Sequence, residues 1–293
     1  MIRDFEGYGR NPPDARWPGG AKLAINFVIN HEEGGELSVP DGDGVSEGGL
    51  TEGGTITVGG RDLGAESMFQ YGSRVGFWRL YRLFRQYDLP CTIYAAAAAL
   101  PRTPQICAAI REAGWDVVGH GYKWVTHAGM SEEQEREVLI KATRIIEETC
   151  GQKPLGWYTR YAPSLNTRRL LIELGYLYDS DAYDDELPYW NYEYGKPHLV
   201  IPYTLVNNDV RFPRNGMHSG AEFEEYIMGA IEMCLSEPGS RMLNIGLHNR
   251  IIGHPARAIG LKRVLERVKS MKEVWVAARR DIALHWIKEH PPA

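Results

Sequence analysis

Acids and histidines stand at the ends of three apolar runs of this sequence. Glu32 and Glu33 follow the run at residues 22–30 and precede paired glycines. His120 stands between two glycines after a second run, and His248 ends a third. Carboxylates and imidazoles are common proton-transfer groups in hydrolysis. The pattern therefore predicts acid–base chemistry, and His248 is the best candidate for a general acid or base by position alone.

Two further polar side chains follow apolar runs in the same way. Arg160 comes after residues 155–158 and could polarise a carbonyl group or bind a carboxylate with two nitrogens. Asp181 comes after residues 176–178 and could orient Arg160 or a histidine. The alternatives, a surface salt bridge for Arg160 and a turn acid for Asp181, stay open.

Composition narrows the classes of function. The 293 residues carry a formal net charge of −5 without a basic run, which disfavours nucleic-acid binding. No apolar stretch approaches the roughly 20 residues of a membrane span, and the start has no apolar signal region, so we expect a cytoplasmic protein without membrane contact. The four cysteines form no C-x-x-C pair, which indicates reduced thiols. No phosphate-binding loop or G-x-S-x-G motif is present.

The elements that must hold these residues alternate between two periodicities. Apolar, partly β-branched runs predict strands, and 3.6-residue periodicity predicts helices between them. The predicted strands are 22–30, 91–94, 115–118, 155–158, 176–178, 199–203, 242–247 and 274–276. The predicted helices are 73–87, 104–113, 131–151, 167–174, 221–235, 256–269 and a last one ending near 288. This order predicts an α/β fold with a parallel sheet, and catalytic groups then belong at the carboxyl ends of the strands.

The pattern does not separate a barrel from an open sheet, although the length suits a barrel of about 250 residues with insertions. We expect one catalytic domain over residues 1–293 because no domain break is evident. A Gly-rich stretch at about 34–64 is long for a loop in a compact domain. Such loops are usually functional or disordered, so this stretch is a candidate cover for the site.

The strand-end motifs resemble those of the polysaccharide deacetylase (NodB-homology) superfamily, whose fold is a distorted (β/α) barrel of about seven or eight strands. The corresponding motifs are its paired aspartates, its two histidines, its Arg-x-Pro and its Leu-His. His31-Glu32-Glu33-Gly34 matches the paired aspartates, and His120-Gly121-Tyr122-Lys123-Trp124 matches the two histidines. Arg160-Tyr161-Ala162-Pro163 matches the Arg-x-Pro motif, and Leu247-His248 matches the Leu-His motif.

The resemblance is closer to one branch of that superfamily, the cofactor-independent bacterial allantoinases, and it covers nearly the whole chain. Stretches that carry it include Tyr71-Gly72-Ser73-Arg74, Leu155-Gly156-Trp157-Tyr158-Thr159 and Tyr178-Asp179-Ser180-Asp181. It implies hydrolytic opening of a cyclic amide, with allantoin as first choice, in a homotetramer. Glu32 or Glu33 would then be the base, with its pKa raised by the neighbouring acid. His120 and Arg160 would polarise the carbonyl, and His248 would protonate the leaving nitrogen. The residues assigned to substrate binding are His31, Glu36, Trp124, Tyr158, Asp181, Asn249 and Arg250.

One departure concerns a metal. Trp124 stands four places after His120, where a deacetylase would carry a second histidine. A catalytic zinc normally has three protein ligands and a water, so the missing imidazole leaves an incomplete set. We therefore predict no cofactor. A divalent metal such as zinc stays an alternative, and its candidate ligands are Glu33, His120, His31 and His127.

Other departures separate this chain from the allantoinase branch. His31 stands where that branch suggests tyrosine, Asn249 stands where it suggests cysteine, and residues 160–163 differ. These changes leave other substrates open. One alternative is a cyclic-imide or other hydantoin hydrolase with a bound divalent metal. The others are a metal-dependent N-acetyl sugar deacetylase and a binding module without catalysis.

Overall fold

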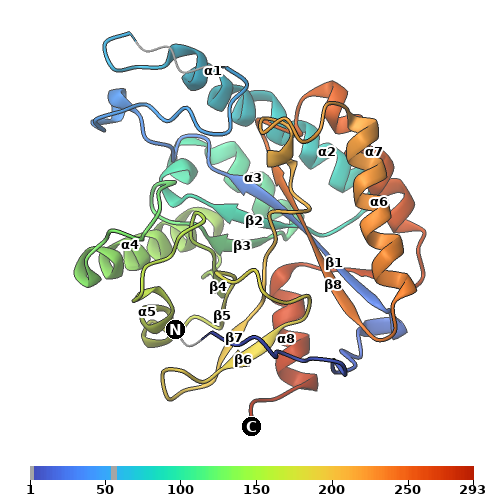
Figure 1. The fold of residues 1–293 in the computed structure, drawn as a ribbon. Helices are drawn as coiled ribbons and strands as arrows, with labels where there is room; N and C mark the ends of the chain where they lie inside the picture. Colours follow the sequence, from blue (N-terminus) through green and yellow to red (C-terminus); the bar gives the residue numbers. More distant parts are fainter. Residues whose placement is uncertain (1–2, 54–57) are drawn as a thin grey trace.

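A computed structural model of the chain describes residues 3–53 and 58–293, and its centre is a curled sheet (Figure 1). The described residues form nine strands. They are β1 (Leu23–His31), β2 (Thr92–Ala95), β3 (Asp116–Gly119), β4 (Gly156–Trp157), β5 (Tyr178–Asp179), β6 (Tyr189–Asn191), β7 (His198–Val200), β8 (Arg241–His248) and β9 (Val274–Val276).

The strand order is β6-β7-β5-β4-β3-β2-β1-β8, and β9 also pairs with β1. All pairs are parallel except β6 with β7. The curled, mainly parallel sheet forms a half-barrel and confirms the predicted α/β fold of the distorted-barrel type. All eight predicted strands are present. The additional strand, β6, has only three half-buried residues, and so short a segment gives no clear periodic signal.

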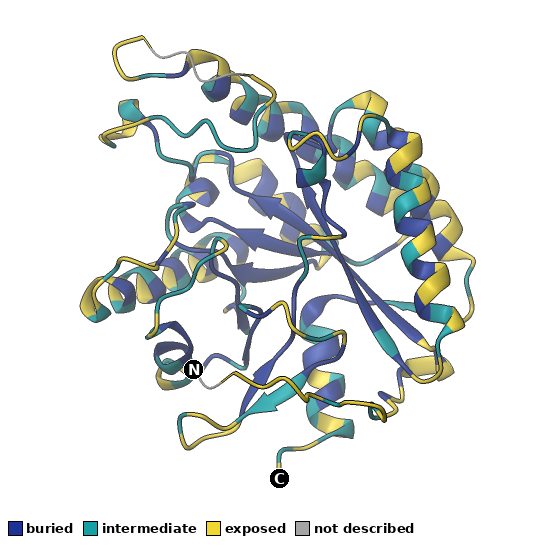
Figure 2. Cartoon of the chain, in the orientation of Figure 1, coloured by how far each residue is buried: buried dark blue, intermediate teal, exposed yellow. Residues whose placement is uncertain are grey.

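Eight α-helices of the described residues pack around the sheet (Figure 1). They are α1 (Leu63–Tyr71), α2 (Phe77–Tyr87), α3 (Pro104–Ala113), α4 (Glu132–Cys150), α5 (Thr167–Glu173), α6 (Gly220–Ser236), α7 (Pro255–Lys269) and α8 (Arg279–Glu289). Figure 2 shows α6 and α7 with buried residues toward the sheet and exposed residues outward. The Ser131 capping box that begins α4 is formed in the structure. None of the described helices is long and apolar enough to cross a membrane.

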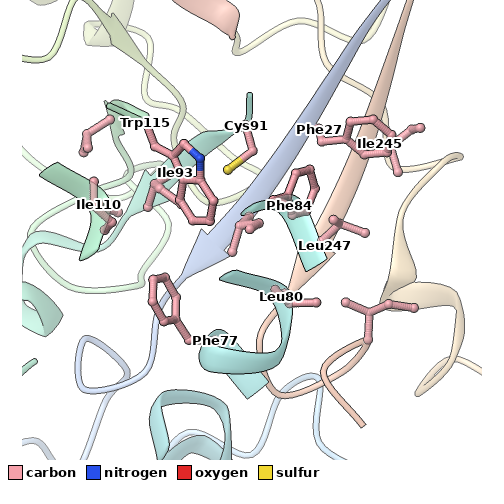
Figure 3. Packing of buried hydrophobic residues seen from close by; sticks show 14 of the residues in the cluster. Phe27, Phe77, Leu80, Phe84, Cys91, Ile93, Ile110, Trp115, Ile245 and Leu247 are labelled. Atoms are coloured by element: carbon pink, nitrogen blue, oxygen red, sulfur yellow. The ribbon is translucent and has the colours of Figure 1, made fainter. Parts of the chain in front are cut away.

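The hydrophobic core holds β1 and β8 in place, and these two strands lead to Glu32 and His248. All nine residues of β1 are buried, as are seven of the eight residues of β8. The rings of Phe27 in β1 and Phe84 in α2 lie edge to face with centroids 5.5 Å apart, and Figure 3 shows part of this cluster. Each large apolar side chain buried here contributes about 1.5–3 kcal/mol. The ends of β1 and β8 therefore have a firm support.

The Gly-rich stretch leaves β1 and returns to the sheet through α1. Within its described part, four acids form ion pairs with arginine or lysine side chains elsewhere in the chain. These pairs are Asp41–Arg102, Asp43–Lys123, Glu47–Arg160 and Glu52–Arg257. Residues 54–57 of the predicted loop lie outside the described residues. The described part is thus attached to the barrel at four places.

Candidate active site

The carboxyl ends of β1, β3 and β8 bring the predicted proton-transfer groups together. In the parallel pairing of β1 with β8, Asn30 stands opposite His248, so Glu32 follows just beyond His248. His120 directly follows β3. The backbone beside it has a left-handed turn at Gly121, where φ is +91° and an added Cβ would lie 2.5 Å from the Lys123 carbonyl oxygen. Any other side chain at position 121 would therefore clash with the backbone.

Glu32 occupies the centre of the site. Its Oε1 lies 3.4 Å from Nε2 of His120 and 3.5 Å from Nε2 of His248, and its Oε2 lies 2.8 Å from Arg250. Burial alone would raise the pKa of this carboxyl. The charges of Arg250 and His248, with hydrogen bonds from the two histidines, outweigh burial and hold the pKa of Glu32 well below its usual range.

Glu33 lies behind Glu32, away from the cavity. Its Oε2 accepts a hydrogen bond from the Asn249 amide at 2.9 Å and lies 3.4 Å from Nδ1 of His31. Burial would raise the pKa of Glu33, but His31, Arg250 and Asn249 lower it. The predicted upward shift of the base's pKa by the neighbouring acid is therefore wrong for both glutamates, because Arg250 lies beside each of them.

His248 is held by an acid that the sequence patterns did not single out. Nδ1 of His248 lies 2.6 Å from Oδ1 of Asp209, and the backbone N–H of His248 donates to Oδ2 of the same carboxylate at 2.7 Å. Burial would lower the pKa of His248. The carboxylates of Glu32 and Asp209 overcome that effect and raise it to about 9. His248 therefore carries a proton at neutral pH.

Asp209 belongs to a short 3-10 helix, η5 (Asp209–Arg211), in a connection that precedes β8 by some 30 residues. A bridge between Asn208 and Gly246 sets this segment beside β8. No local pattern marks such a contact. The only available signal is an acid after two asparagines in an otherwise irregular segment.

His120 is fixed by its other nitrogen. Nδ1 lies 2.7 Å from the carbonyl oxygen of Tyr158 and donates to it, so Nε2 is the atom that faces Glu32. The imidazole also stacks on the ring of Tyr158, with centroids 5.1 Å apart and planes 8° apart. A carbonyl acceptor of this kind fixes the orientation of a histidine ring.

Arg160 reaches the site from the loop after β4. One of its nitrogens donates to Glu47 at 2.6 Å and to the carbonyl of Trp124 at 2.7 Å. Its guanidinium carbon lies 3.5 Å from the centre of the Trp124 ring. Asp181, which we expected to orient Arg160 or a histidine, instead accepts hydrogen bonds from the backbone and hydroxyl of Thr159. It therefore acts on Arg160 only through the loop.

A cavity of about 110 Å³ opens beside Glu32. Six predicted site residues line it: Glu32, His120, Trp124, Tyr158, Arg160 and His248. Leu50 from the Gly-rich stretch lines it as well, in agreement with a covering role for that stretch. The sequence did not single out the remaining lining residues, which are Asn30, Tyr161, Tyr203, Leu205, Asn208, Val210 and Arg214.

Several predicted site residues do not line the cavity. His31, Asn249 and Arg250 surround Glu33, where they are buried. Glu36 accepts a hydrogen bond from the backbone of Gly34 in its own turn, and burial raises its pKa. The substrate-binding assignment of these residues is thus not supported by their positions, because they do not line the cavity.

The residues present do not fit a divalent metal. The proposed ligands are dispersed: His127 pairs with Glu135 at 2.9 Å, whereas His31 and Glu33 lie behind Glu32. Trp124 supplies no ligand atom, and the Arg250 guanidinium already lies between the two carboxylates. Among residues 3–53 and 58–293, no three His, Cys, Asp or Glu side chains gather as a metal site.

Comparison with other sequences points to one family. The sequence profile described as polysaccharide deacetylase matches residues 65–178. A Schizosaccharomyces pombe protein, provisionally named a polysaccharide deacetylase, is 36% identical over 315 aligned residues, which cover 99% of this chain and 98% of that protein. A Helicobacter pylori peptidoglycan deacetylase is 30% identical over 47% of this chain and 48% of its own length.

Comparison with solved structures extends the similarity over the full length. The crystal structure of PuuE allantoinase is 47% identical, with a TM-score of 0.95 and coverage of 100% of this chain and 99% of that one. A Pseudomonas aeruginosa protein, provisionally named a polysaccharide deacetylase, is 46% identical, with a TM-score of 0.95 and full coverage of both chains. These alignments include β1 and β8, the strands that present Glu32 and His248.

Proposed function

Because the chain belongs to the polysaccharide deacetylase family of hydrolases, we propose that it opens a hydantoin-type cyclic amide ring, with allantoin as the substrate. The full-length similarity to an allantoinase structure supports this choice. The observation that carries it is the placement of one ionised carboxylate, Glu32, between two histidines at the wall of a small cavity. We propose that this chemistry needs no metal.

In this proposal, Glu32 takes a proton from a water molecule as the water oxygen bonds to the ring carbonyl carbon. Arg160 and His120, whose Nε2 must carry a proton for this role, stabilise the negative charge that develops on the carbonyl oxygen. The carbon–nitrogen bond then breaks, and His248 donates its proton to the leaving nitrogen. Since Glu32 is ionised and His248 is protonated at neutral pH, both begin in the form that their step requires. Their 3.5 Å separation allows the proton to return from Glu32 to His248.

The size of the cavity favours a small ring over a sugar chain. Its volume of about 110 Å³ is well below the roughly 300–1,000 Å³ of pockets for larger ligands. Leu50 and Arg160, which pairs with Glu47, line it on the side of the Gly-rich stretch. The aromatic rings of Trp124 and Tyr158 offer flat walls for a planar ring.

One observation favours a second candidate, a hydrolase of another cyclic imide or hydantoin. Tyr161, within the stretch that departs from the allantoinase pattern, lines the cavity and has a positive φ of 55°. A side chain in this strained position at the cavity can alter which ring substituents fit. By contrast, His31 and Asn249, the other departures, contact Glu33 and do not line the cavity, so they give no reason to change the ring.

A substrate panel tests the proposal. Purified protein is incubated with allantoin, hydantoin, succinimide or N-acetylglucosamine, each with and without a chelator, and ring opening or acetate release is measured. We expect opening of allantoin at the same rate with the chelator. Turnover confined to the sugar, or abolished by the chelator, would contradict the proposal. Preference for succinimide would favour the second candidate.

A further inference from the structure

The side chain of Arg250 is buried beneath the two acids that follow β1. It is 1% exposed, and one of its nitrogens lies 2.8 Å from Oε2 of Glu32 and 3.4 Å from Oε1 of Glu33. The guanidinium carbon lies 4.3 Å from the centre of the Phe69 ring and 4.9 Å from that of Trp124. Arg250 thus contacts both carboxylates on one side and aromatic rings on the other.

The loop that carries Arg250 is closely packed. It begins at the end of β8 and runs against the π-helical segment η3 (Gly72–Gly76) that joins α1 to α2. A Cβ added to Gly76 would lie 2.0 Å from the carbonyl oxygen of Asn249. Only glycine permits this approach, so the backbone next to Arg250 has little freedom to shift.

An uncharged side chain at position 250 would leave buried carboxylates without a neighbouring positive charge. Glu32, Glu33 and Asp209 are all buried, and transfer of unpaired charges from water to a protein interior is strongly unfavourable. His248 supplies one positive charge, which pairs with Glu32 and Asp209. Glu33 also contacts His31 and Asn249. Arg250 gives it a cation that stays charged at all ordinary pH values, because a guanidinium loses its proton only at very high pH.

A role in substrate binding does not fit this geometry. Arg250 does not line the cavity, and Glu32 lies between it and the two histidines that do. Nε and the second terminal nitrogen of Arg250 have no hydrogen-bond partner among the described residues and are buried. These N–H groups face aromatic surroundings in place of water or substrate.

We propose that Arg250 is a built-in cation that positions Glu32 and Glu33 and prevents divalent metal ions from binding at these two carboxylates. The inference deepens the proposed function, and its hydrolytic consequence rests on that function. A metal ion would have to bind next to a fixed guanidinium charge with no ligand from Trp124. Removal of that charge leaves the buried Glu32 carboxylate within 3.5 Å of the Nε2 atoms of His120 and His248, and a carboxylate with two imidazoles is a suitable set of zinc ligands.

The test compares zinc binding of the whole chain before and after removal of the charge. Arg250→Met keeps an unbranched apolar stem against Phe69 and Trp124. The matched control is Arg257→Met, since Arg257 also pairs with a glutamate, Glu52 at 2.6 Å, and lies 4.6 Å from an aromatic ring, but outside the cavity. Metal-free proteins are titrated with Zn²⁺ alone by calorimetry, and zinc retained after gel filtration is measured.

We expect about one zinc ion per chain in Arg250→Met, and none in the wild type or Arg257→Met. Zn²⁺ should also raise the Tm of Arg250→Met alone, because a ligand that binds the folded state stabilises it. Stoichiometric zinc in the wild type overturns the proposal, as does a folded Arg250→Met protein that binds no more zinc than the wild type.

If Arg250→Met does not fold without metal, Zn²⁺ added during refolding should recover folded protein, and failure of this recovery also overturns the proposal. Arg250→Lys, which keeps the charge, should fold and bind no zinc. Turnover of allantoin is measured separately, with an expected loss of about 100-fold or more in Arg250→Met. Zinc binding is measured without substrate, so it tests the role of Arg250 even if the protein does not open allantoin. Likewise, the turnover of allantoin by the wild type tests the proposed function whatever the zinc result.

Discussion

Two arginine–glutamate contacts adjoin the cavity in different surroundings. We call the buried contact, Arg250 with Glu32, the floor and the more exposed contact, Arg160 with Glu47, the mouth. At the floor, Arg250 and Glu32 are each 1% exposed and lie 2.8 Å apart. At the mouth, Arg160 is 27% exposed and Glu47 is 14% exposed, at a distance of 2.6 Å. The mouth contact is thus the shorter of the two, although water reaches it more easily.

The difference shows that distance alone does not rank these interactions. Water and salt screen an ion pair at the surface, where such pairs contribute about 0–1 kcal/mol. In the interior, removal of one partner leaves an uncompensated charge and costs about 3–5 kcal/mol. We therefore expect changes at the floor to affect chemistry strongly, and changes at the mouth to affect mainly substrate binding.

The largest expected effect is that of Glu32→Gln. The amide cannot accept the proton of the attacking water, so kcat should fall by about 10³-fold, within the usual range for loss of a general base. The matched control is Glu33→Gln, because Glu33 is equally buried and also contacts Arg250 but does not line the cavity. We expect it to lose about tenfold. Steady-state assays compare the two, and near-normal turnover in both would rule out the carboxylate mechanism.

The next effect concerns stability at a buried pair away from the cavity. Glu135 is fully buried and accepts hydrogen bonds from His127, Ser164 and Thr167. Glu135→Ala should lower the free energy of unfolding by about 3 kcal/mol, since these donors lose a charged acceptor. Urea denaturation measures the change.

The control for Glu135 lies on the same helix. Glu132 is 41% exposed and pairs with Arg136 and Arg169. Glu132→Ala should change the free energy of unfolding by less than about 1 kcal/mol. An equal loss in both variants would show that solvent exposure is not what separates these sites.

Much of the fold and part of the site follow from local patterns. Each buried run gave a strand, and the parallel order placed the ends of β1, β3 and β8 at one edge, where Glu32, His120 and His248 meet. That inference needs only periodicity and the rule that sites form at carboxyl ends of strands. The family resemblance was confirmed by relatives that cover the whole chain.

The charges of the site could not be predicted in this way. The neighbouring acids Glu32 and Glu33 suggested a raised pKa, but the structure gives a lowered one because Arg250, more than 200 residues away, lies beside both. Asp209 was missed for the same reason, since its partner His248 is 39 residues distant. A sequence pattern shows which residues are adjacent in the chain. The electrostatic potential at a buried atom, however, depends on residues that only the tertiary fold brings near.

A smaller effect, on pH dependence, tests another contact at the floor. The pKa of His248 is raised to about 9, so its proton is present below that pH and kcat should fall as the pH rises through about 9. Asp209→Asn removes one negative charge, lowers the pKa of His248 and should move the alkaline limb down by about 1–3 units. Activity is measured from about pH 6 to pH 10.

The sign for stability follows from the same shift. Because the folded-state pKa lies above the unfolded value of about 6.5, this interaction stabilises the fold fully at low pH and is lost as the pH rises through about 9. The control is Asp281→Asn, which changes a partly exposed acid in α8 and should leave the limb in place. An unchanged limb in Asp209→Asn would mean that Asp209 does not determine the protonation of His248.

The smallest expected effect is that of Glu47→Gln at the mouth. Loss of the ion pair loosens Arg160 and the covering stretch, so KM should rise about two- to fivefold, while kcat stays within about twofold. Glu52→Gln is the control, because Glu52 lies on the same stretch but pairs with Arg257, which does not line the cavity, and the KM of this variant should be unchanged. Added salt should weaken the wild-type pair and reduce the difference between wild type and Glu47→Gln, since screening acts on exposed charges. If kcat instead fell as far as in Glu32→Gln, the ion pair with Glu47 would be needed to hold Arg160 against the transition state, and the mouth would belong to the chemistry as much as the floor does.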